Sequence, residues 1–150
     1  MLACALGRSG IGIKRGEGDG VTPRGSFRLL CAMIRAERID LRSAQLDLTR
    51  ILPSDGWCDA PGDRNYNRPV NLPYPASHEE LRRSDHLYDV AIVLDYNVSQ
   101  RLTAKGGGSA IFFHLARDGY TPTEGCVAIS RRDMLWLLPR IDSKTEMVIG

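Results

Sequence analysis

The chain has 150 residues, the length of a typical single domain, and it can bury a hydrophobic core without a disulfide or a metal ion. Hydrophobic residues make up 43% and charged residues 25%, a globular composition that excludes a disordered or fibrous protein. The net charge of +2 produces no strong field, so no nucleic-acid partner is expected. The longest apolar runs, Val90–Leu94 and Ala110–Phe113, are too short to cross a bilayer, so no transmembrane segment is expected either.

The first residues do not have the pattern of a secretory signal peptide, because Gly7 and Arg8 interrupt the apolar stretch after Met1. Three alternatives follow: a cytoplasmic protein, a mature form, or a chain that is trimmed at its start.

The four cysteines include no Cys-x-x-Cys pair, so a structural zinc site is not expected. A disulfide from Cys4 or Cys31 to Cys58 is one alternative for three of them, and burial as small hydrophobic side chains is the other. Cys126 differs from these three because of its neighbours in sequence.

The first half of the chain is predicted to contain turns and two strands. Residues 7–25 include seven glycines, which favours turns, and no Gly-Lys-Ser/Thr follows them as in a phosphate-binding loop. Alternating apolar residues predict strands over Ser26–Ile34 and Gln45–Leu52. The residues expected to face inward are Phe27, Leu29, Cys31 and Met33 in the first strand and Leu46, Leu48 and Leu52 in the second.

Residues 53–77 hold five of the eight prolines and are predicted to form a long irregular loop. Its aromatic residues Trp57, Tyr66 and Tyr74 argue against disorder, so we expect an ordered, functional loop. One or two helical turns are predicted over Ser77–Arg83, because Ser77 is followed three positions later by Glu80, as in a capping box.

The second half is predicted to contain most of the sheet and one helix. Its strands are expected at Asp89–Asp95, Ala110–Leu115, Cys126–Ile129 and Glu146–Ile149. The first of these is a continuous apolar run bounded by charges, typical of a strand buried on both faces. The helix is predicted over Arg131–Leu138, with Ser130 as its N-cap and Asp133 facing that cap. Trp57 and Trp136 are expected in the core and His78 on the solvated surface.

Two residues form a candidate catalytic pair. His114 lies near the end of an apolar strand, and Cys126 follows twelve positions later, directly after Glu124 and Gly125. A thiol becomes an effective nucleophile when a neighbouring imidazole takes its proton. The turn before Cys126 would let backbone N–H groups converge on an oxyanion, and Gly125 would allow the close approach. A core cysteine and an unrelated, hydrogen-bonded histidine are the alternative.

The segments around this pair resemble a known signature. Ile111-Phe112-Phe113-His114 followed by Thr123-Glu124-Gly125-Cys126-Val127 resembles the L,D-transpeptidase catalytic domain family (YkuD type), in which an apolar strand ends in His and Ser/Thr-His-Gly-Cys follows. Gly20–Phe27 resembles the family's Thr-Pro-x-Gly-x-Phe segment, and the order of the two segments also fits. The resemblance implies a mainly β fold with minor α content, in which residues 1–150 form a single catalytic domain with a mixed sheet and one C-terminal helix.

The resemblance also implies a role for each matching residue. Cys126 would be the nucleophile and His114 the general base, oriented by the backbone carbonyl of Leu115. The amides of Gly125 and Cys126, with that of Glu124, would form the oxyanion hole. The implied reaction is acyl transfer on a peptidoglycan stem peptide of the bacterial cell wall, through a thioacyl-enzyme. No metal or organic cofactor is implied, and the implied location is the cell envelope or periplasm.

The sequence departs from the family pattern at three points. Glu124 replaces the second histidine of the motif, Ala128 replaces an arginine often found there, and the spacing from His114 to Cys126 is short. A carboxylate that points inward would disfavour the thiolate, so we expect Glu124 to point away or to pair with an arginine such as Arg117.

Four further residues are candidates for lining the substrate groove, and local hydrogen bonding within loops is their alternative role. They are Tyr66, Asn67, His86 and Tyr88.

Three other functions remain open from the sequence. The same site could hydrolyse stem peptides as an L,D-carboxypeptidase, or the domain could bind peptidoglycan without turnover. Cys126 and Arg132 also have the Cys-x5-Arg spacing of cysteine-dependent phosphatases. That function is disfavoured because the apolar residues Val127–Ile129 are typical of a strand and not of a phosphate-binding loop.

Overall fold

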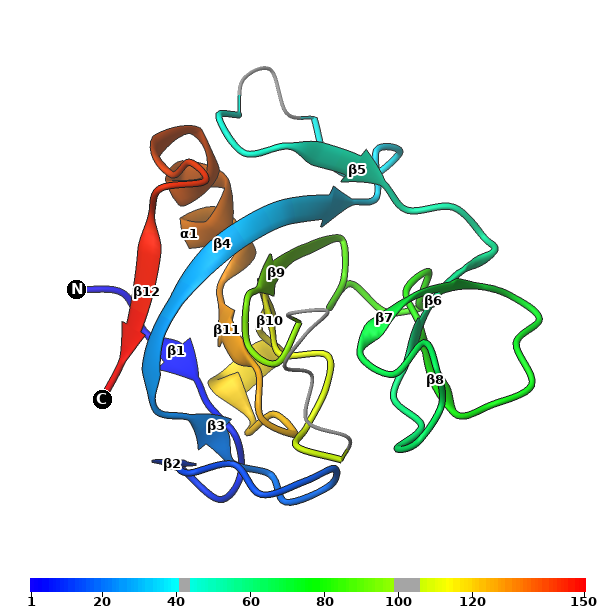
Figure 1. The fold of residues 1–150 in the computed structure, drawn as a ribbon. Helices are drawn as coiled ribbons and strands as arrows, with labels where there is room; N and C mark the ends of the chain where they lie inside the picture. The colour runs from blue at the N-terminus through cyan, green and yellow to red at the C-terminus, as the bar shows by residue number, and fades with distance from the viewer. Residues whose placement is uncertain (41–43, 99–105) are drawn as a thin grey trace.

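The computed structural model describes residues 1–40, 44–98 and 106–150 (Figure 1). Its main sheet comprises β1 (Cys4–Ala5), β4 (Gly25–Ile34), β5 (Leu48–Arg50), β9 (Val90–Leu94), β10 (Phe112–Leu115), β11 (Val127–Ile129) and β12 (Glu146–Ile149). The spatial order is β1-β11-β10-β9-β4-β12, with β5 beside β4. Two pairs, β10–β11 and β4–β5, are parallel and the others antiparallel, so the mixed sheet expected from the sequence is confirmed.

Two small sheets complete the β structure. One pairs β2 (Ile11–Gly12) with β3 (Thr22–Pro23), and the other contains β6 (Asp55–Cys58), β7 (Arg68–Asn71) and β8 (His78–Glu80). The proline-rich segment is therefore ordered, as expected, but only partly irregular, because it contains β6 and β7, and β6 pairs antiparallel with both β7 and β8. The prediction of helical turns over Ser77–Arg83 is wrong, because β8 forms there and its pairing with β6 overrides the local capping pattern.

The single α-helix of the described residues confirms its prediction. Helix α1 (Arg131–Leu137) starts after Ser130, whose hydroxyl accepts a hydrogen bond from the amide of Asp133 at 3.1 Å. It continues into the 3₁₀ helix η2 (Leu138–Arg140), and a second 3₁₀ turn, η1 (Asp118–Tyr120), precedes β11. Trp136 is not in the core as expected: it is 54% exposed, with the guanidinium of Arg140 lying 4.3 Å from its ring centroid.

A bulge in β4 changes which of its residues face each side. The register shifts between Leu29 and Cys31, so the expected common face of Phe27, Leu29, Cys31 and Met33 is interrupted. Leu29 packs on the α1 side, whereas Met33 packs on the opposite side.

The second predicted strand is shorter than expected, because only Leu48–Arg50 of Gln45–Leu52 pairs in the sheet. Leu46 is buried as predicted, but Leu48 and Leu52 are exposed.

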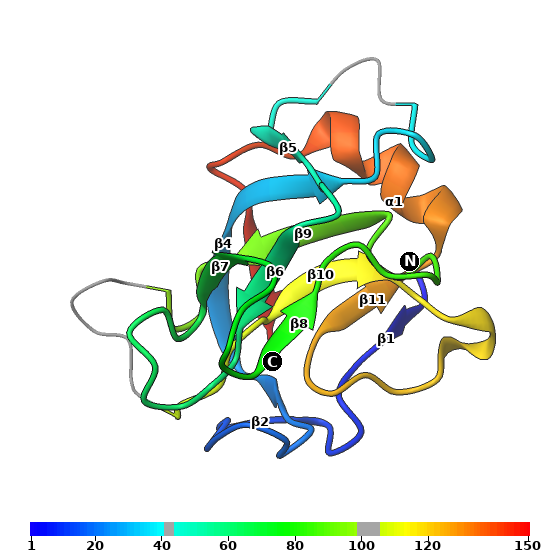
Figure 2. The same cartoon turned by 90° about the vertical axis from the view of Figure 1, so that its right-hand side faces the viewer.

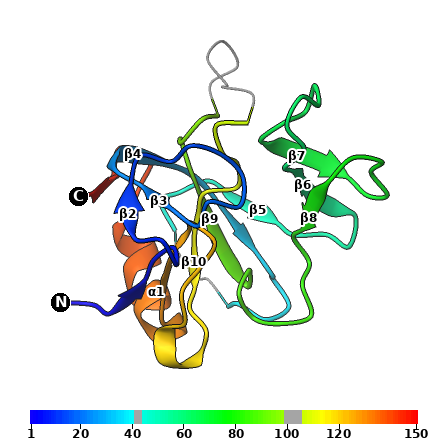
Figure 3. The same cartoon turned by 90° about the horizontal axis from the view of Figure 1, so that it is seen from below.

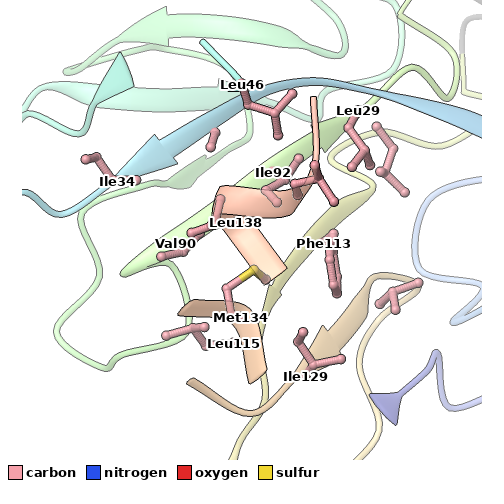
Figure 4. Close-up of a cluster of buried hydrophobic side chains, with 14 of the residues drawn as sticks. Leu29, Ile34, Leu46, Val90, Ile92, Phe113, Leu115, Ile129, Met134 and Leu138 are labelled. Carbon is pink, nitrogen blue, oxygen red and sulfur yellow. The ribbon is translucent and has the colours of Figure 1, made fainter. Parts of the chain in front are cut away.

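The main sheet carries a hydrophobic core on each face. Helix α1 covers one face, where Met134 and Leu138 pack against Ile92 and Phe113 (Figure 4). The β6-β7-β8 sheet lies on the other side (Figures 1 and 3), and Figure 2 views the molecule from this side. There Trp57 packs with Phe112, as expected for a core tryptophan. All five residues of β9 are buried between the two cores, which confirms the predicted two-sided burial.

All four cysteines, each in the part of the chain that the structure describes, are free. The disulfide alternative is therefore wrong in this structure. Cys58 is buried, whereas Cys4 is exposed and so does not behave as a buried hydrophobic side chain.

We expect Met134→Ala to lower the free energy of unfolding by about 2–5 kcal/mol, because it leaves a cavity between α1 and the sheet. Trp136→Ala, on the exposed face of the same helix, should cost about 1 kcal/mol or less. Urea unfolding followed by circular dichroism measures both. Equal losses in the two variants would contradict the assignment of the helix faces.

Candidate active site

A cavity of about 620 Å³ lies beside His114 of β10, between the loop before β11, strand β8 and the glycine-rich loop. His114 and Cys126 both line it, together with Lys14, Glu79 and Tyr88. The cavity therefore combines the predicted nucleophile and base with groups of both charge signs.

The pairing of β10 with β11 brings the two predicted residues to the same face of the sheet. The strands run parallel, with Phe113 opposite Val127 and His114 opposite Ala128. Because side chains alternate along a strand, His114 points to the face opposite Phe113. Cys126 directly precedes β11 and belongs to the hydrophobic cluster on that same face. Both side chains thus reach the cavity from neighbouring strands.

His114 is buried and held in one orientation. Its Nδ1 lies 2.8 Å from the carbonyl oxygen of Leu115, which can only accept, so Nδ1 carries the proton. This leaves Nε2 with a lone pair. Burial, followed by the nearby positive charges of Arg83 and Arg117, lowers the pKa of His114 to about 4 despite that hydrogen bond. The ring also packs edge-on against Tyr88, at 5.3 Å between centroids.

The surroundings of Cys126 favour a protonated thiol. Its Sγ–H donates to the carbonyl oxygen of Ala110 at 3.2 Å, and its sulfur accepts from the amide of Phe112 at 3.4 Å. Burial and the nearby carboxylate of Glu79 raise the pKa of Cys126 to about 12, whereas the Phe112 hydrogen bond and the Lys14 charge act in the opposite direction.

Ala110 owes its unusual backbone conformation to Asn67. Ala110 has a φ of 51°, in the left-handed region that a residue with a Cβ rarely adopts. Its amide donates to Oδ1 of Asn67 at 3.0 Å, and the same oxygen accepts from Nε1 of Trp57 at 2.9 Å. The proline-rich segment therefore holds the carbonyl that contacts the thiol.

A family model of the L,D-transpeptidase catalytic domain, YkuD, matches residues 1–149. The chain belongs to this family. No curated protein and no solved structure matches the chain. Within the described residues of this L,D-transpeptidase-family domain, no helix is long and apolar enough to span a membrane. Across residues 1–40, 44–98 and 106–150, no three His, Cys, Asp or Glu side chains are grouped as metal ligands would be.

In this YkuD domain, the side chain of Thr123 holds the turn before Cys126. The hydroxyl of Thr123 accepts from the amide of Gly125 at 3.1 Å and donates to the carbonyl oxygen of Cys126 at 2.7 Å. Glu124 is exposed and pairs with an arginine, as expected, although the partner is Arg8 and not Arg117. Its carboxylate is thereby drawn toward the N-terminal segment, which agrees with the expectation that it points away from the thiol.

The four predicted groove residues differ in their positions. Tyr88 lines the cavity. Asn67 lies behind it, as does Tyr66, whose hydroxyl donates to Glu17 and accepts from the amide of Gly108 at 2.9 Å. His86 is exposed, with Nε2 3.0 Å from the carbonyl oxygen of Ala116. The geometry gives these three positioning or surface roles in place of cavity lining.

Three cavity residues were not recognised from the sequence. His78, expected on the solvated surface, is half-buried in the cavity lining. Glu79, on β8, accepts a hydrogen bond from the hydroxyl of Tyr88 at 2.5 Å, and burial raises its pKa. Lys14 has an almost fully buried side chain beside Asp19. The only sequence signal for Lys14 is a lysine inside a glycine-rich segment with an aspartate five positions later.

The stability of the domain should depend on pH through His114. Its pKa is 6.5 when exposed and about 4 when folded, so between these values the unfolded chain binds a proton that the folded protein does not. This lowers the free energy of unfolding by about 3 kcal/mol as the pH falls through that window. His114→Gln removes this component.

Urea unfolding of both proteins at about pH 7 and about pH 4.5 provides the test, because the carboxylates common to both cancel in the difference. The wild type should lose more stability on acidification than His114→Gln. Parallel losses would contradict a buried neutral imidazole.

Proposed function

We propose that this domain catalyses cysteine-dependent acyl transfer on peptidoglycan stem peptides through a thioacyl-enzyme, with Cys126 as nucleophile and His114 as general base. The observation that carries the proposal is the orientation of His114. Because Nδ1 is committed to the carbonyl of Leu115, the basic Nε2 is available in the cavity that Cys126 also lines. The family acts on peptidoglycan peptides, so we propose the cell envelope as its location.

The first step forms the thioester. Cys126 Sγ leaves the carbonyl of Ala110, transfers its proton to Nε2 of His114 and attacks the carbonyl carbon of a diamino-acid residue. The tetrahedral intermediate then expels the amine of the terminal D-amino acid, which takes the proton from the imidazolium. The new bond is the C–S thioester bond, and the broken bond is the C–N peptide bond.

The second step releases the acyl group. An acceptor amine attacks the thioester carbonyl and loses a proton to His114, and the departing sulfur recovers that proton. The product is a cross-link, and Cys126 returns to its thiol form. If water replaces the amine, the same step produces a trimmed peptide, which is L,D-carboxypeptidase activity.

The pKa values favour concerted proton transfer. With the pKa of Cys126 near 12 and that of His114 near 4, both groups are neutral at about pH 7. A preformed thiolate–imidazolium pair would need the pKa of Cys126 to lie below neutral pH and the pKa of His114 to lie above it. The proton therefore moves as the sulfur attacks, when the new C–S bond stabilises the developing charge.

The amides of Glu124, Gly125 and Cys126 are the proposed oxyanion donors. Gly125 has a φ of 138° and a buried backbone, so its turn is accessible only to a glycine. Its amide bonds to the hydroxyl of Thr123, so it would have to exchange this hydroxyl for the substrate oxygen. A tetrahedral oxyanion is a stronger acceptor than a hydroxyl, which favours the exchange.

Exposure to a carbapenem should produce a covalent adduct on Cys126, detected by intact-protein mass spectrometry and peptide mapping. Cys126→Ala should abolish the adduct, and His114→Ala should slow its formation by about 10²-fold or more, because the general base is lost. Cys4→Ala, which removes an exposed cysteine, is the matched control and should acylate at the wild-type rate. Folded wild-type protein without an adduct would count against catalysis and favour a non-catalytic binding module.

Product analysis with a tetrapeptide-bearing muropeptide separates the two enzymatic outcomes. We expect dimers that depend on both Cys126 and His114. Release of D-alanine without dimers would contradict cross-linking and indicate trimming of the stem peptide, with the same nucleophile and base.

A further inference from the structure

Lys14 is a buried cation in the lining of the cavity that forms the proposed active site. Its side chain is only 2% exposed, and its Nζ lies 2.6 Å from Oδ1 of Asp19 and 3.4 Å from the carbonyl oxygen of Val21. Burying an ammonium group is costly, and a buried ion pair is often no more stable than an apolar pair of the same volume. The cost calls for a role beyond packing.

Two glycines make room for this side chain. A Cβ at Gly108 would lie 2.4 Å from Cε of Lys14, and a Cβ at Gly125 would lie 3.3 Å from Nζ. The ammonium group therefore lies against the backbone of the residue that precedes Cys126. Any larger residue at position 108 would push the lysine out of this position.

Asp19 holds the ammonium from the side of the glycine-rich loop. Besides Lys14, its carboxylate accepts from the amides of Arg15, Gly16 and Val21, at 2.8, 3.2 and 3.0 Å. The carboxylate is thus fixed by the loop backbone, and the lysine lies between it and the Gly125 turn. This order puts the positive end of the pair toward the thiol.

The charge of Lys14 acts on Cys126 in the direction that catalysis needs. Burial and Glu79 raise the pKa of the thiol, whereas the positive charge of Lys14 acts to lower it, as does the hydrogen bond from the amide of Phe112. Glu124, the nearest acidic residue in sequence, is paired with Arg8 and exposed. Negative charge that develops at Cys126 or on the substrate oxygen would therefore be stabilised by Lys14.

We propose that Lys14 is an electrostatic positioning residue, whose ammonium, fixed by Asp19 against Gly125, stabilises the negative charge that develops on the Cys126 sulfur and on the substrate oxyanion. The proposal rests on the proposed function for its catalytic consequence. Its effect on the thiol does not depend on which acyl donor binds.

The competing role is a structural one, in which Lys14 only neutralises Asp19 and holds the loop. The two roles predict opposite results for Asp19→Asn, which removes the negative charge but keeps one of the two side-chain oxygens that accept from the loop amides. If Lys14 acts through its field, Asp19→Asn should leave thiol reactivity unchanged or raise it severalfold. If the pair only holds the loop, Asp19→Asn should lower it, as Lys14→Met does.

The experiment measures alkylation of Cys126 by iodoacetamide between about pH 7 and pH 10, with peptide mapping to separate the four cysteines. Lys14→Met should slow alkylation at every pH by about tenfold, equivalent to one pH unit in thiol pKa. The neutral double variant Lys14→Met/Asp19→Asn leaves no unpaired buried charge, and it should remain equally slow. Lys144→Met, an exposed lysine before β12, is the matched control and should react as the wild type does. Circular dichroism verifies that each variant is folded.

Carbapenem acylation of the same variants separates this proposal from the proposed function. A wild type that acylates, with a slow double variant, supports both. A wild type that acylates, with wild-type rates of acylation and alkylation in the double variant, overturns only the role of Lys14. If the wild type does not acylate, the proposed function fails, and the alkylation series still decides whether Lys14 activates the thiol.

Discussion

The parallel pairing of β10 with β11 is the constraint on which the candidate site depends. His114 lies within β10 and Cys126 directly before β11, so the register of Phe113 opposite Val127 puts both side chains on one face. A shift of one residue between these strands would send one of them into the core beneath α1. The tight packing of Phe113 and Leu115 against that helix opposes such a shift, because it would bury His114 among apolar side chains. The core on one face thereby holds the two side chains of the candidate site on the other.

The elements that the sequence predicted well are those whose signal is local. Strand β9 is one continuous apolar run, and α1 has both its capping serine and the aspartate that faces it. Two motifs in the expected order also pointed to His114 and Cys126, which both line the cavity. The predictions that were wrong depend on partners that are distant in the chain. Residues 78–80 form a strand because they pair with β6, and the bulge in β4 reverses which side of the sheet the residues beyond Leu29 face. The exposure of Trp136 follows from helix geometry, since Met134 of α1 and Leu138 at the start of η2 point inward and residue 136 lies on the opposite face.

The site residues that sequence reasoning missed are likewise set by tertiary contacts. Nothing near Lys14 in the sequence indicates that its ammonium lies against Gly125, more than a hundred positions away. Asn67 was a candidate for the substrate groove, with local hydrogen bonding as its alternative role, and its side-chain oxygen connects Trp57 to Ala110. In both cases the residue type was notable, but its function depends on which distant backbone it contacts. Hydrogen-bond partners of this kind have no periodic signal in one sequence.

Opposing charges surround the buried thiol of Cys126, and in the proposed mechanism they would let it be both stable and reactive. Burial protects Cys126 as a thiol, and Glu79 reinforces the protonated form, so the free protein carries little reactive thiolate. Lys14 favours the anion from the opposite direction, yet its own charge is already balanced by Asp19. Such a field cannot ionise the thiol by itself. In the proposed mechanism, this field becomes effective when His114 removes the proton and charge moves onto the substrate oxygen, because a fixed ammonium needs no reorganisation at that moment. The ion pair would then act on the transition state more than on the resting protein.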